Sequence, residues 1–220
     1  FEWSGDNYEF HLLTHNTSDI LAFLAPGMFI HENTELMVAV KEDGRLDGSL
    51  VSNRIAKGNN YAKGIKATVD NADSTLTADI SIETIELAKI TVSDNTLEVS
   101  ARQDTLNVHL AYGGDTANRG NIFLTGNLER IEEKIRTGID ILPSSVYING
   151  EKWSLPKSSI GLNGDTIEID SFEINSGSQK IWADGKISEK TDTLAGGLER
   201  FDISILERLL ESDIGIKGKL

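Results

Sequence analysis

The chain has 220 residues, no cysteine and a formal net charge of −14, with 35 acidic against 21 basic residues. The absence of cysteine excludes disulfides, thiolate metal sites and a cysteine nucleophile. The acidic balance repels phosphate backbones, so we expect no nucleic acid partner. Hydrophobic residues make up 39% of the chain, and no window approaches the roughly 18 consecutive apolar residues of a membrane-spanning helix.

Residues 13–25 resemble residues 198–210 near the other end of the chain. The shared positions are Leu13/Leu198, Ile20/Ile205, Leu21/Leu206 and Leu24/Leu209. Each copy follows a strand-like run, carries an Asp or Ser at a candidate helix cap and continues for about two helical turns. This repeat predicts one or two short helices and favours an elongated, stacked architecture.

We interpret residues 1–220 as one elongated β-repeat segment, with possible sub-repeats 1–145 and 146–220. The chain begins at Phe1 without an initiator Met, and it ends within an alternating run at residues 214–220. We therefore expect it to be a fragment of a longer protein.

Alternation of apolar and polar residues dominates the middle of the chain. Residues 76–82, 97–101 and 106–112 each place apolar side chains on one face and polar side chains on the other. Polar turns are expected at residues 70–73, 93–95 and 102–104, and such short turns favour an antiparallel meander.

The second half of the chain repeats this pattern at residues 167–174 and 181–187. The step from Ile169 to Phe172 breaks the alternation by one residue, as a β-bulge would. Turn signals recur roughly every ten residues, and several glycines fall inside strand patterns, where they permit curvature. The sequence thus predicts an all-β protein with a strongly curved antiparallel sheet.

Residues 129–136 are ambiguous, because their apolar residues also suit one face of a helix; we favour a strand. Residues 139–141 and 146–148 are clearer strands. Pro143 and Pro156 are expected to mark strand starts or loops.

No residue pattern predicts catalysis. His11 and His15 could share a face of an extended run, but no cysteine or His-Glu pattern accompanies them, so we expect no metal. The acidic residues from Asp165 to Glu173 occupy the polar face of a hairpin, where solvent would keep them equivalent. Neither a Gly-x-Ser-x-Gly elbow nor a phosphate-binding Gly-rich loop is present. We expect a protein that is not an enzyme and has no cofactor.

Two further patterns leave alternatives open. Arg54, Lys57, Lys63 and Lys66 form a stretch without acids, which is either a solvated hairpin or a contact for anionic headgroups. Five tripeptides of Asp, a hydroxyl residue and a small or apolar residue resemble an O-glycosylation acceptor, or are turn residues that lead into strands. They begin at Asp73, Asp104, Asp115, Asp165 and Asp192.

Three stretches resemble the TamB-like proteins of Bacteroidetes, within the AsmA-like group. Residues 20–30 are similar to a segment that ends in an apolar turn with Pro-Gly. Residues 142–153 are similar to a Pro-Ser motif followed by a Trp, here Trp153. Residues 167–188, with Leu194 and residues 201–206, resemble a strand–Gln–strand–Gly–x–Ile–Ser–helix unit.

This resemblance implies a long periplasmic protein of a Gram-negative cell envelope, anchored in the inner membrane and reaching the outer membrane. Its sheet curls into an open, taco-like groove with an apolar floor. The family is implicated in phospholipid transport between the membranes. Through a partner outer-membrane barrel protein, it is also implicated in assembling outer-membrane and autotransporter proteins.

Under this interpretation, apolar strand residues line the groove and contact phospholipid acyl chains, which slide without a strong polar anchor. The candidate groove-lining residues are Leu76, Ile80, Ile82, Leu97, Val99, Leu106, Val108, Leu110, Ile167, Ile169, Ile181 and Ile187. Alternation alone leaves open whether a second layer covers this face instead.

Two alternative functions remain. One is a protein-binding scaffold or chaperone that offers exposed strand edges to an unfolded outer-membrane client. The other is a carbohydrate-binding or carbohydrate-processing β protein, which the small number and wide separation of the aromatic residues disfavour.

Overall fold

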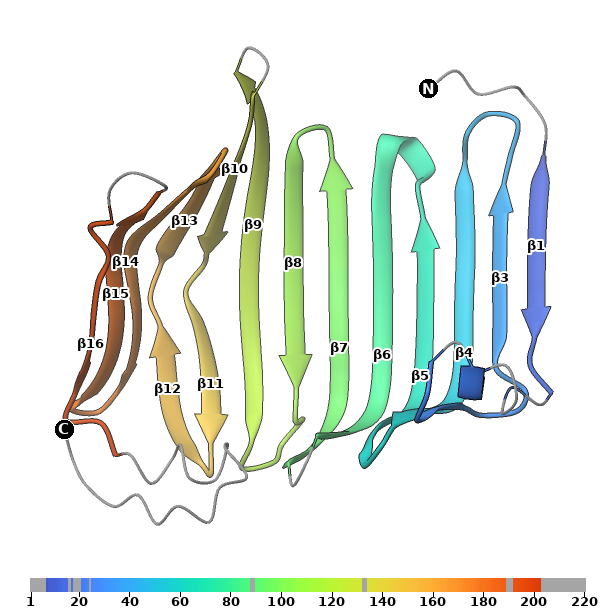
Figure 1. The fold of residues 1–220 in the computed structure, drawn as a ribbon, viewed down its shortest axis with the longest axis horizontal. Coiled ribbons are helices and arrows are strands. Elements are labelled where there is room, and N and C mark those ends of the chain that lie inside the picture. The colour runs from blue at the N-terminus through green and yellow to red at the C-terminus, as the bar shows by residue number, and fades with distance from the viewer. Residues whose placement is uncertain are drawn as a thin grey trace. The chain divides into compact units, whose positions relative to one another are not determined.

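A computed structural model describes residues 7–15, 17, 21–23, 25–87, 90–131, 134–188 and 192–202. Strands account for 72% of the structure, and their pairing is antiparallel (Figure 1). The prediction of an all-β, antiparallel protein is therefore confirmed. The open groove concerns the overall shape and stays a prediction.

One of the two expected short helices lies among the described residues, as a single turn at residues 21–23. Two backbone bonds hold this turn: Leu21 N donates to the Thr17 carbonyl at 2.8 Å, and Ala25 N donates to the Leu21 carbonyl at 2.8 Å. The second copy of the repeat, residues 198–210, is described only as far as Asp202, so the helix expected in it cannot be compared.

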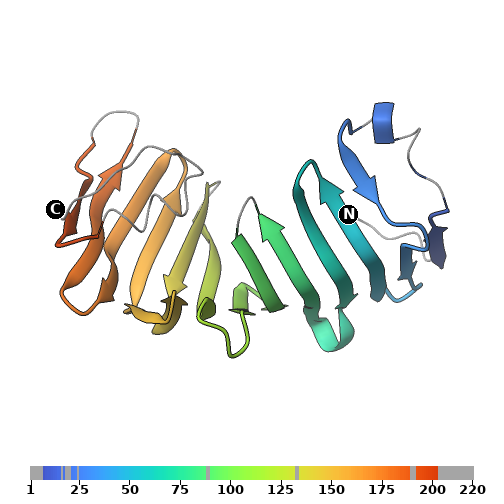
Figure 2. The ribbon, with the colours of Figure 1, turned by 90° about the horizontal axis from the view of Figure 1, so that it is seen from below.

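The chain divides into two compact units. The first unit comprises residues 1–103 and 110–114, and the second comprises residues 104–109 and 115–220. Strand β8 (Thr105–Tyr112) contributes residues to both. Figure 2 shows the strands from a second side, with the twist that is usual within a sheet. The sub-repeats 1–145 and 146–220 are a prediction about repeated strand patterns. The division into compact units does not test this repetition, so the sub-repeats stay a prediction.

The first unit is an antiparallel sheet in which most consecutive strands pair. Its strands, in order across the sheet, are β1 (Tyr8–Leu13), β3 (Glu35–Val40), β4 (Leu46–Lys57), β5 (Asn60–Asp70), β6 (Thr75–Leu87) and β7 (Ile90–Arg102). A short strand, β2 (Met28–Ile30), pairs with the end of β4. From β3 to β7, neighbours in sequence are neighbours in the sheet, so short connections suffice there; β1 and β3 pair although residues 14–34, which include β2, separate them.

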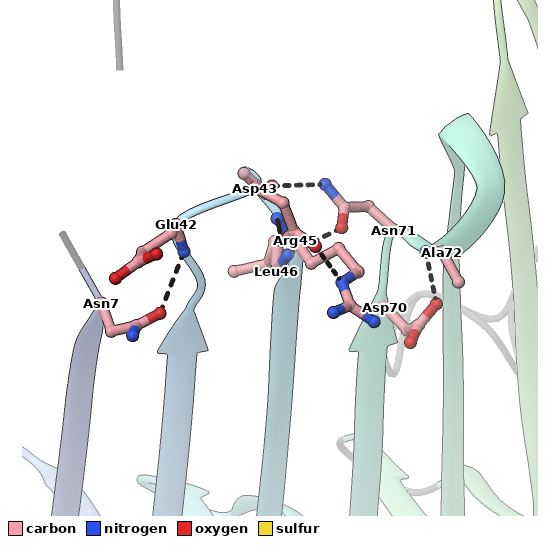
Figure 3. Close-up of polar contacts among 9 residues, drawn as sticks. Asn7, Glu42, Asp43, Arg45, Leu46, Asp70, Asn71 and Ala72 are labelled. Carbon is pink, nitrogen blue, oxygen red and sulfur yellow. Dashed lines mark hydrogen bonds and ion pairs between the residues drawn. The ribbon is translucent and has the colours of Figure 1, made fainter. Parts of the chain in front are cut away.

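Side chains fix the turns at one end of this unit (Figure 3). Asn71 Oδ1 accepts a hydrogen bond from Leu46 N at 2.7 Å, and Asn71 Nδ2 donates to the Gly44 carbonyl at 3.1 Å. Asp43 accepts from Arg45 N at 3.1 Å and from Arg45 Nε at 2.7 Å. The hydrogen bonds that the Arg45 backbone N–H and the Arg45 side chain donate hold the pKa of the Asp43 carboxyl below its ordinary value. These contacts satisfy backbone groups that the ladder leaves unpaired at the strand ends.

The expected turns at residues 70–73 and 102–104 are confirmed, since both connect consecutive strands. A short 3₁₀ turn, η1 (Ala72–Ser74), forms the first of them. The expected turn at residues 93–95 is wrong, because these residues lie within β7. Asp94 has a positive φ of 51°, so it kinks the strand without ending it.

Irregular backbone positions in the neighbouring strands β5 and β6 lie next to this kink. Gly64 in β5 has a φ of 65°, and the apolar pattern of β6 steps from Ile82 to Ile85 by three residues rather than two. A Cβ at Gly64 would lie 2.3 Å from the Glu83 side chain. Gly64 is therefore required both for its backbone conformation and for this close approach.

The second unit is built around one long hairpin that runs between two long strands. Its first arm is β10 (Lys134–Ile141) followed by β11 (Ser144–Ile148), and its second arm is β12 (Glu151–Leu155) followed by β13 (Ser158–Asn163). The first arm pairs with β9 (Arg119–Ile131), and the second arm pairs with β14 (Thr166–Ser176). Strands β15 (Gln179–Ile187) and β16 (Ala195–Glu199) follow β14.

Two prolines interrupt this hairpin. The pairs Ile141/Ser158 and Ser144/Leu155 have the same offset, so Pro143 lies opposite Pro156. Neither proline has an N–H, and the ladder breaks at this point. The expectation that both prolines mark strand starts or loops is confirmed.

Several other strand predictions in this unit are also confirmed. Residues 129–131 and 134–136 are strand rather than helix, and residues 139–141 and 146–148 belong to β10 and β11. The β-bulge between Ile169 and Phe172 is present as a register shift between β14 and β15.

Few side chains of the described residues are buried, and most of the buried apolar ones lie in the second unit. Trp153 is 2% exposed and Phe201 is 3% exposed, and their ring centroids are 5.9 Å apart. Ile141 and Leu155 are also buried. This small core fixes the residues after β16 against the hairpin.

A network of hydrogen bonds also supports the contact between Phe201 and Trp153. Glu151 Oε1 accepts hydrogen bonds from Ser176 Oγ at 2.7 Å and from Gln179 Nε2 at 2.9 Å. Gln179 Oε1 in turn accepts from Asp202 N at 2.8 Å. Because Asp202 follows Phe201 directly, this network positions the Phe201 ring.

Candidate functional site

One face of the first unit is apolar over five neighbouring strands. The register brings one row of side chains into direct cross-strand pairs, and this row consists of Leu36, Leu50, Ala67, Ile80 and Leu97. The next row on the same face consists of Val38, Gly48, Val69, Ala78 and Val99. We call this surface, defined by the two rows, the apolar face.

The opposite face of the same strands is mainly polar. Its corresponding row consists of Met37, Ser49, Thr68, Asp79 and Glu98. Since side chains alternate along a strand, the period-two pattern of the sequence separates these two surfaces directly.

The structure brings five of the twelve predicted site residues together on the apolar face or next to it. Leu76, Ile80 and Ile82 lie along β6, and Ile80 pairs directly with Leu97 of β7. Val99 lies two residues further along β7. Their alternation places all five on one side of the sheet.

The predicted residues of β8 alternate along that strand but belong to different units. Leu106 and Val108 belong to the second unit, whereas Leu110 belongs to the first.

In the second unit, Ile167 and Ile169 lie on β14, and Ile181 and Ile187 lie on β15. Ile167 pairs directly with Ile187. Ile169 pairs with Gly185, and Ile181 pairs with Ile174 beyond the bulge. These four residues therefore form a second apolar group in the second unit.

Four of the twelve predicted side chains are exposed, and the other eight are half-buried. Leu76 and Leu106 are each 40% exposed, and Ile167 is 39% exposed. Ile80, Ile82, Leu97 and Val99 are half-buried. By contrast, Ile65, on the same side of the sheet, is only 7% exposed. The apolar face is therefore less closely packed than the position of Ile65, and a larger accessible apolar surface is a candidate interaction site.

Sequence reasoning missed the part of the apolar face that β3, β4 and β5 contribute. The residues concerned are Leu36, Val38, Leu50 and Val69. In β3 the signal is masked because Met37 and Ala39 on the other face are also apolar, so strict alternation is absent. Cross-strand register, which the sequence does not state, identifies these positions.

A small polar cluster lies beside the apolar face. Ser52 is 1% exposed, and its Oγ lies 2.6 Å from Thr34 Oγ1. Thr34 N donates to Thr14 Oγ1 at 3.0 Å, and Thr14 Oγ1 donates to the His31 carbonyl at 2.9 Å. These hydroxyl groups are uncharged, and they form hydrogen bonds within the cluster. The cluster therefore offers no charged group that would hold a ligand.

The polar face of the second unit contains a depression of about 680 Å³. Gly138 and Gly161 lie in neighbouring strands at this depression, with Asp140, Asp184 and Ser159 among the other lining residues. Ser159 Oγ donates to Asp140 Oδ1 at 2.6 Å. No group of His, Cys, Asp or Glu within the described part of the chain is arranged to hold a metal ion.

The two histidines considered as ligands do not form such a site. His11 Nε2 lies 2.7 Å from Glu35 Oε1 on the neighbouring strand, so this ring pairs with a carboxylate. His15 follows β1 and is exposed.

The basic stretch lies on the β4–β5 hairpin. Arg54 pairs across the strands with Lys63, and its guanidinium lies 4.6 Å from the centre of the Tyr61 ring. A hydrogen bond with Glu86 raises the pKa of the Tyr61 hydroxyl. Acidic side chains of β6 thus border the basic residues. The five Asp-hydroxyl tripeptides all begin in connections between strands, and both interpretations stay open.

No helix formed by the described residues has the length and apolar character needed to cross a membrane. No known family model matches the chain, and neither the curated proteins nor the solved structures include a match.

Proposed function

We propose that this chain is a segment of a periplasm-spanning protein whose apolar sheet face carries phospholipid acyl chains between the inner and outer membranes. The observation that carries the proposal is the apolar face itself, a continuous apolar surface over five strands whose large side chains are only half-buried. The resemblance to TamB-like proteins supplies the cellular setting. That setting is the periplasm, with an inner-membrane anchor and an outer-membrane barrel partner reached through parts outside this chain.

The chemistry of the face suits a mobile apolar chain. Each methylene group moved from water to an apolar surface contributes about 0.8 kcal/mol. The two rows of the apolar face contain no charged residue, so no ion pair would hold a headgroup at one position. Acyl chains would therefore be retained by contact area and could still slide along the strands.

The test compares two substitutions at neighbouring positions of β6. Ile80→Asp places a carboxylate on the apolar face, whereas Ser81→Asp places the same group on the exposed polar face. The 220-residue chain and both variants would be purified from a Gram-negative host and analysed by native mass spectrometry and lipid extraction. We expect phospholipid with the parent chain and with Ser81→Asp, and a loss of phospholipid with Ile80→Asp.

Two results would overturn the proposal. One is a parent chain that carries no lipid and does not bind hydrophobic dyes, since its apolar face would then be a closed core. The other is equal lipid content in the Ile80→Asp and Ser81→Asp variants. Circular dichroism of both variants separates loss of the site from loss of the fold.

A protein-binding scaffold or chaperone for outer-membrane proteins is the second candidate, and one observation favours it. All six residues of β1 are exposed, and among the described residues β1 pairs only with β3. A strand of an unfolded client could add to this edge through backbone hydrogen bonds. Under this alternative, client binding survives Ile80→Asp but is lost when the β1 edge is blocked.

A further inference from the structure

Two hairpin turns of the second unit have nearly the same sequence. The turn between β11 and β12 contains Asn149-Gly150, and the turn between β13 and β14 begins at Asn163-Gly164. These are the two Asn-Gly sequences of the chain, and each has an apolar residue before it and an acidic residue after it. Asn-Gly is typical of tight hairpin turns, because both residues tolerate a positive φ.

Asn-Gly is also the sequence in which an asparagine side chain reacts most readily with its own backbone. The nitrogen of the glycine amide loses its proton and attacks the side-chain carbonyl carbon, which closes a five-membered succinimide ring and releases ammonia. Water then opens the ring at either carbonyl and leaves aspartate or isoaspartate. Glycine favours the attack because it has no Cβ to hinder the approach. The rate therefore depends on whether the glycine N–H is held in a hydrogen bond.

At Asn149 the glycine N–H is held. Gly150 N donates to the Ala117 carbonyl at 2.7 Å. Asn149 N also donates to Asn118 Oδ1 at 2.7 Å. Both bonds attach the turn to the connection between β8 and β9, so the turn must open locally before Gly150 N can react.

At Asn163 the corresponding N–H is open to water. Gly164 N forms no hydrogen bond with the part of the chain that the structure describes. Asn163 and Gly164 are both exposed. The turn follows the last pair of its ladder, Asn163 with Thr166, and pairs at the end of a ladder open most readily. The two turns thus differ in structure although their sequences are alike.

We propose that Asn163 is a site of spontaneous modification, where attack by Gly164 N converts the asparagine into aspartate and isoaspartate. Asn149 is protected by the hydrogen bonds of its turn. Each conversion replaces a neutral amide with a carboxylate next to Asp165, in a chain whose net charge is already −14. Isoaspartate also adds one carbon to the main chain at the end of the β13–β14 hairpin. The inference does not depend on the proposed lipid function.

The test compares the two sites within the same molecule. The 220-residue chain would be incubated in a mildly alkaline buffer, and peptides containing each asparagine would be quantified over time by mass spectrometry. Two hydrogen bonds must open at Asn149, so we expect Asn163 to react about tenfold faster or more. In guanidinium chloride, where the chain is unfolded, the two sites should react at similar rates. Equal rates in the folded chain, or faster conversion of Asn149, would overturn the proposal.

Two variants test the cause of the difference, with circular dichroism to verify that each keeps the fold. Asn163→Gln should stop the reaction at residue 163, because the longer side chain closes a ring much more slowly. Asn118→Ala removes the acceptor of Asn149 N, so Asn149 should react faster while Asn163 keeps its rate. A folded Asn118→Ala variant in which Asn149 reacts no faster would overturn the protective role of these hydrogen bonds.

Discussion

Ile65 and Ile80 have the same side chain and lie on the same side of neighbouring strands, yet their environments differ. Ile65 is 7% exposed, whereas Ile80 is half-buried on the apolar face. Substitution of each by alanine removes the same carbon atoms. The difference in stability between the two variants therefore measures how open the apolar face is in solution.

The expected magnitudes follow from the burial of each side chain. The three carbons lost from a fully buried isoleucine correspond to about 2.4 kcal/mol of transfer free energy. A residual cavity adds to this cost at a closed site, so we expect Ile65→Ala to lower the free energy of unfolding by about 3 kcal/mol. At Ile80 water can fill the vacated space, and part of the side chain is already hydrated. We expect a loss of about 1 kcal/mol there.

Urea denaturation followed by circular dichroism is the assay, with the midpoint and slope compared between variants. Both residues belong to the first unit, so both substitutions should affect the same unfolding transition. Equal losses of about 3 kcal/mol or more at the two positions would refute the reasoning. Such a result would mean that a second layer covers Ile80 in solution.

Two further predictions concern the second unit. Trp153→Ala should lower its free energy of unfolding by about 3–5 kcal/mol, measured by urea denaturation, because this side chain is 2% exposed; a loss below about 1 kcal/mol would contradict its role in the core. The Lys180 hydrogen bond and charge, with a hydrogen bond from Asn175, lower the pKa of Glu173 from 4.5, and Glu173 raises that of Lys180 from 10.5. A carboxyl group whose pKa is lowered by folding stabilises the fold at pH values above its pKa in the unfolded chain, so the Glu173 contribution should disappear as the pH falls below about 4.5. The Lys180 contribution should disappear as the pH rises above about 10.5. Glu173→Gln should flatten the acid limb of a thermal stability profile, and an unchanged acid limb would argue against this ion pair.

Local sequence signals were sufficient for much of the fold. The bulge after Ile169 was predictable because a one-residue break in a period-two pattern is typical of an inserted residue. The interruptions at Pro143 and Pro156 were predictable because proline cannot donate to a ladder. The kink at Asp94 was not predictable as such, since an Asp-Asn pair is equally typical of a turn, and only pairing on both sides of it keeps the strand continuous.

The candidate site was predictable only in part. Ile80 and Leu97 could be assigned to an apolar face from alternation alone, but their direct pairing depends on the register between β6 and β7. Leu36 and Leu50 were missed because their strands alternate less strictly. Exposure was beyond the sequence, because an alternating strand has the same pattern whether its apolar side is covered or open.

The sequence by itself determined that this chain forms antiparallel strands with one apolar and one polar side, because side chains alternate with a period of two whatever the strand pairs with. It also determined where strands bend or break, since glycine, proline and the polar turn residues act on the local backbone. Only the tertiary structure decided which strands are neighbours, and that Ile65 is buried while Ile80 is half-buried. Burial depends on residues distant in sequence, such as Phe201 beside Trp153, and no local pattern states which of them come together.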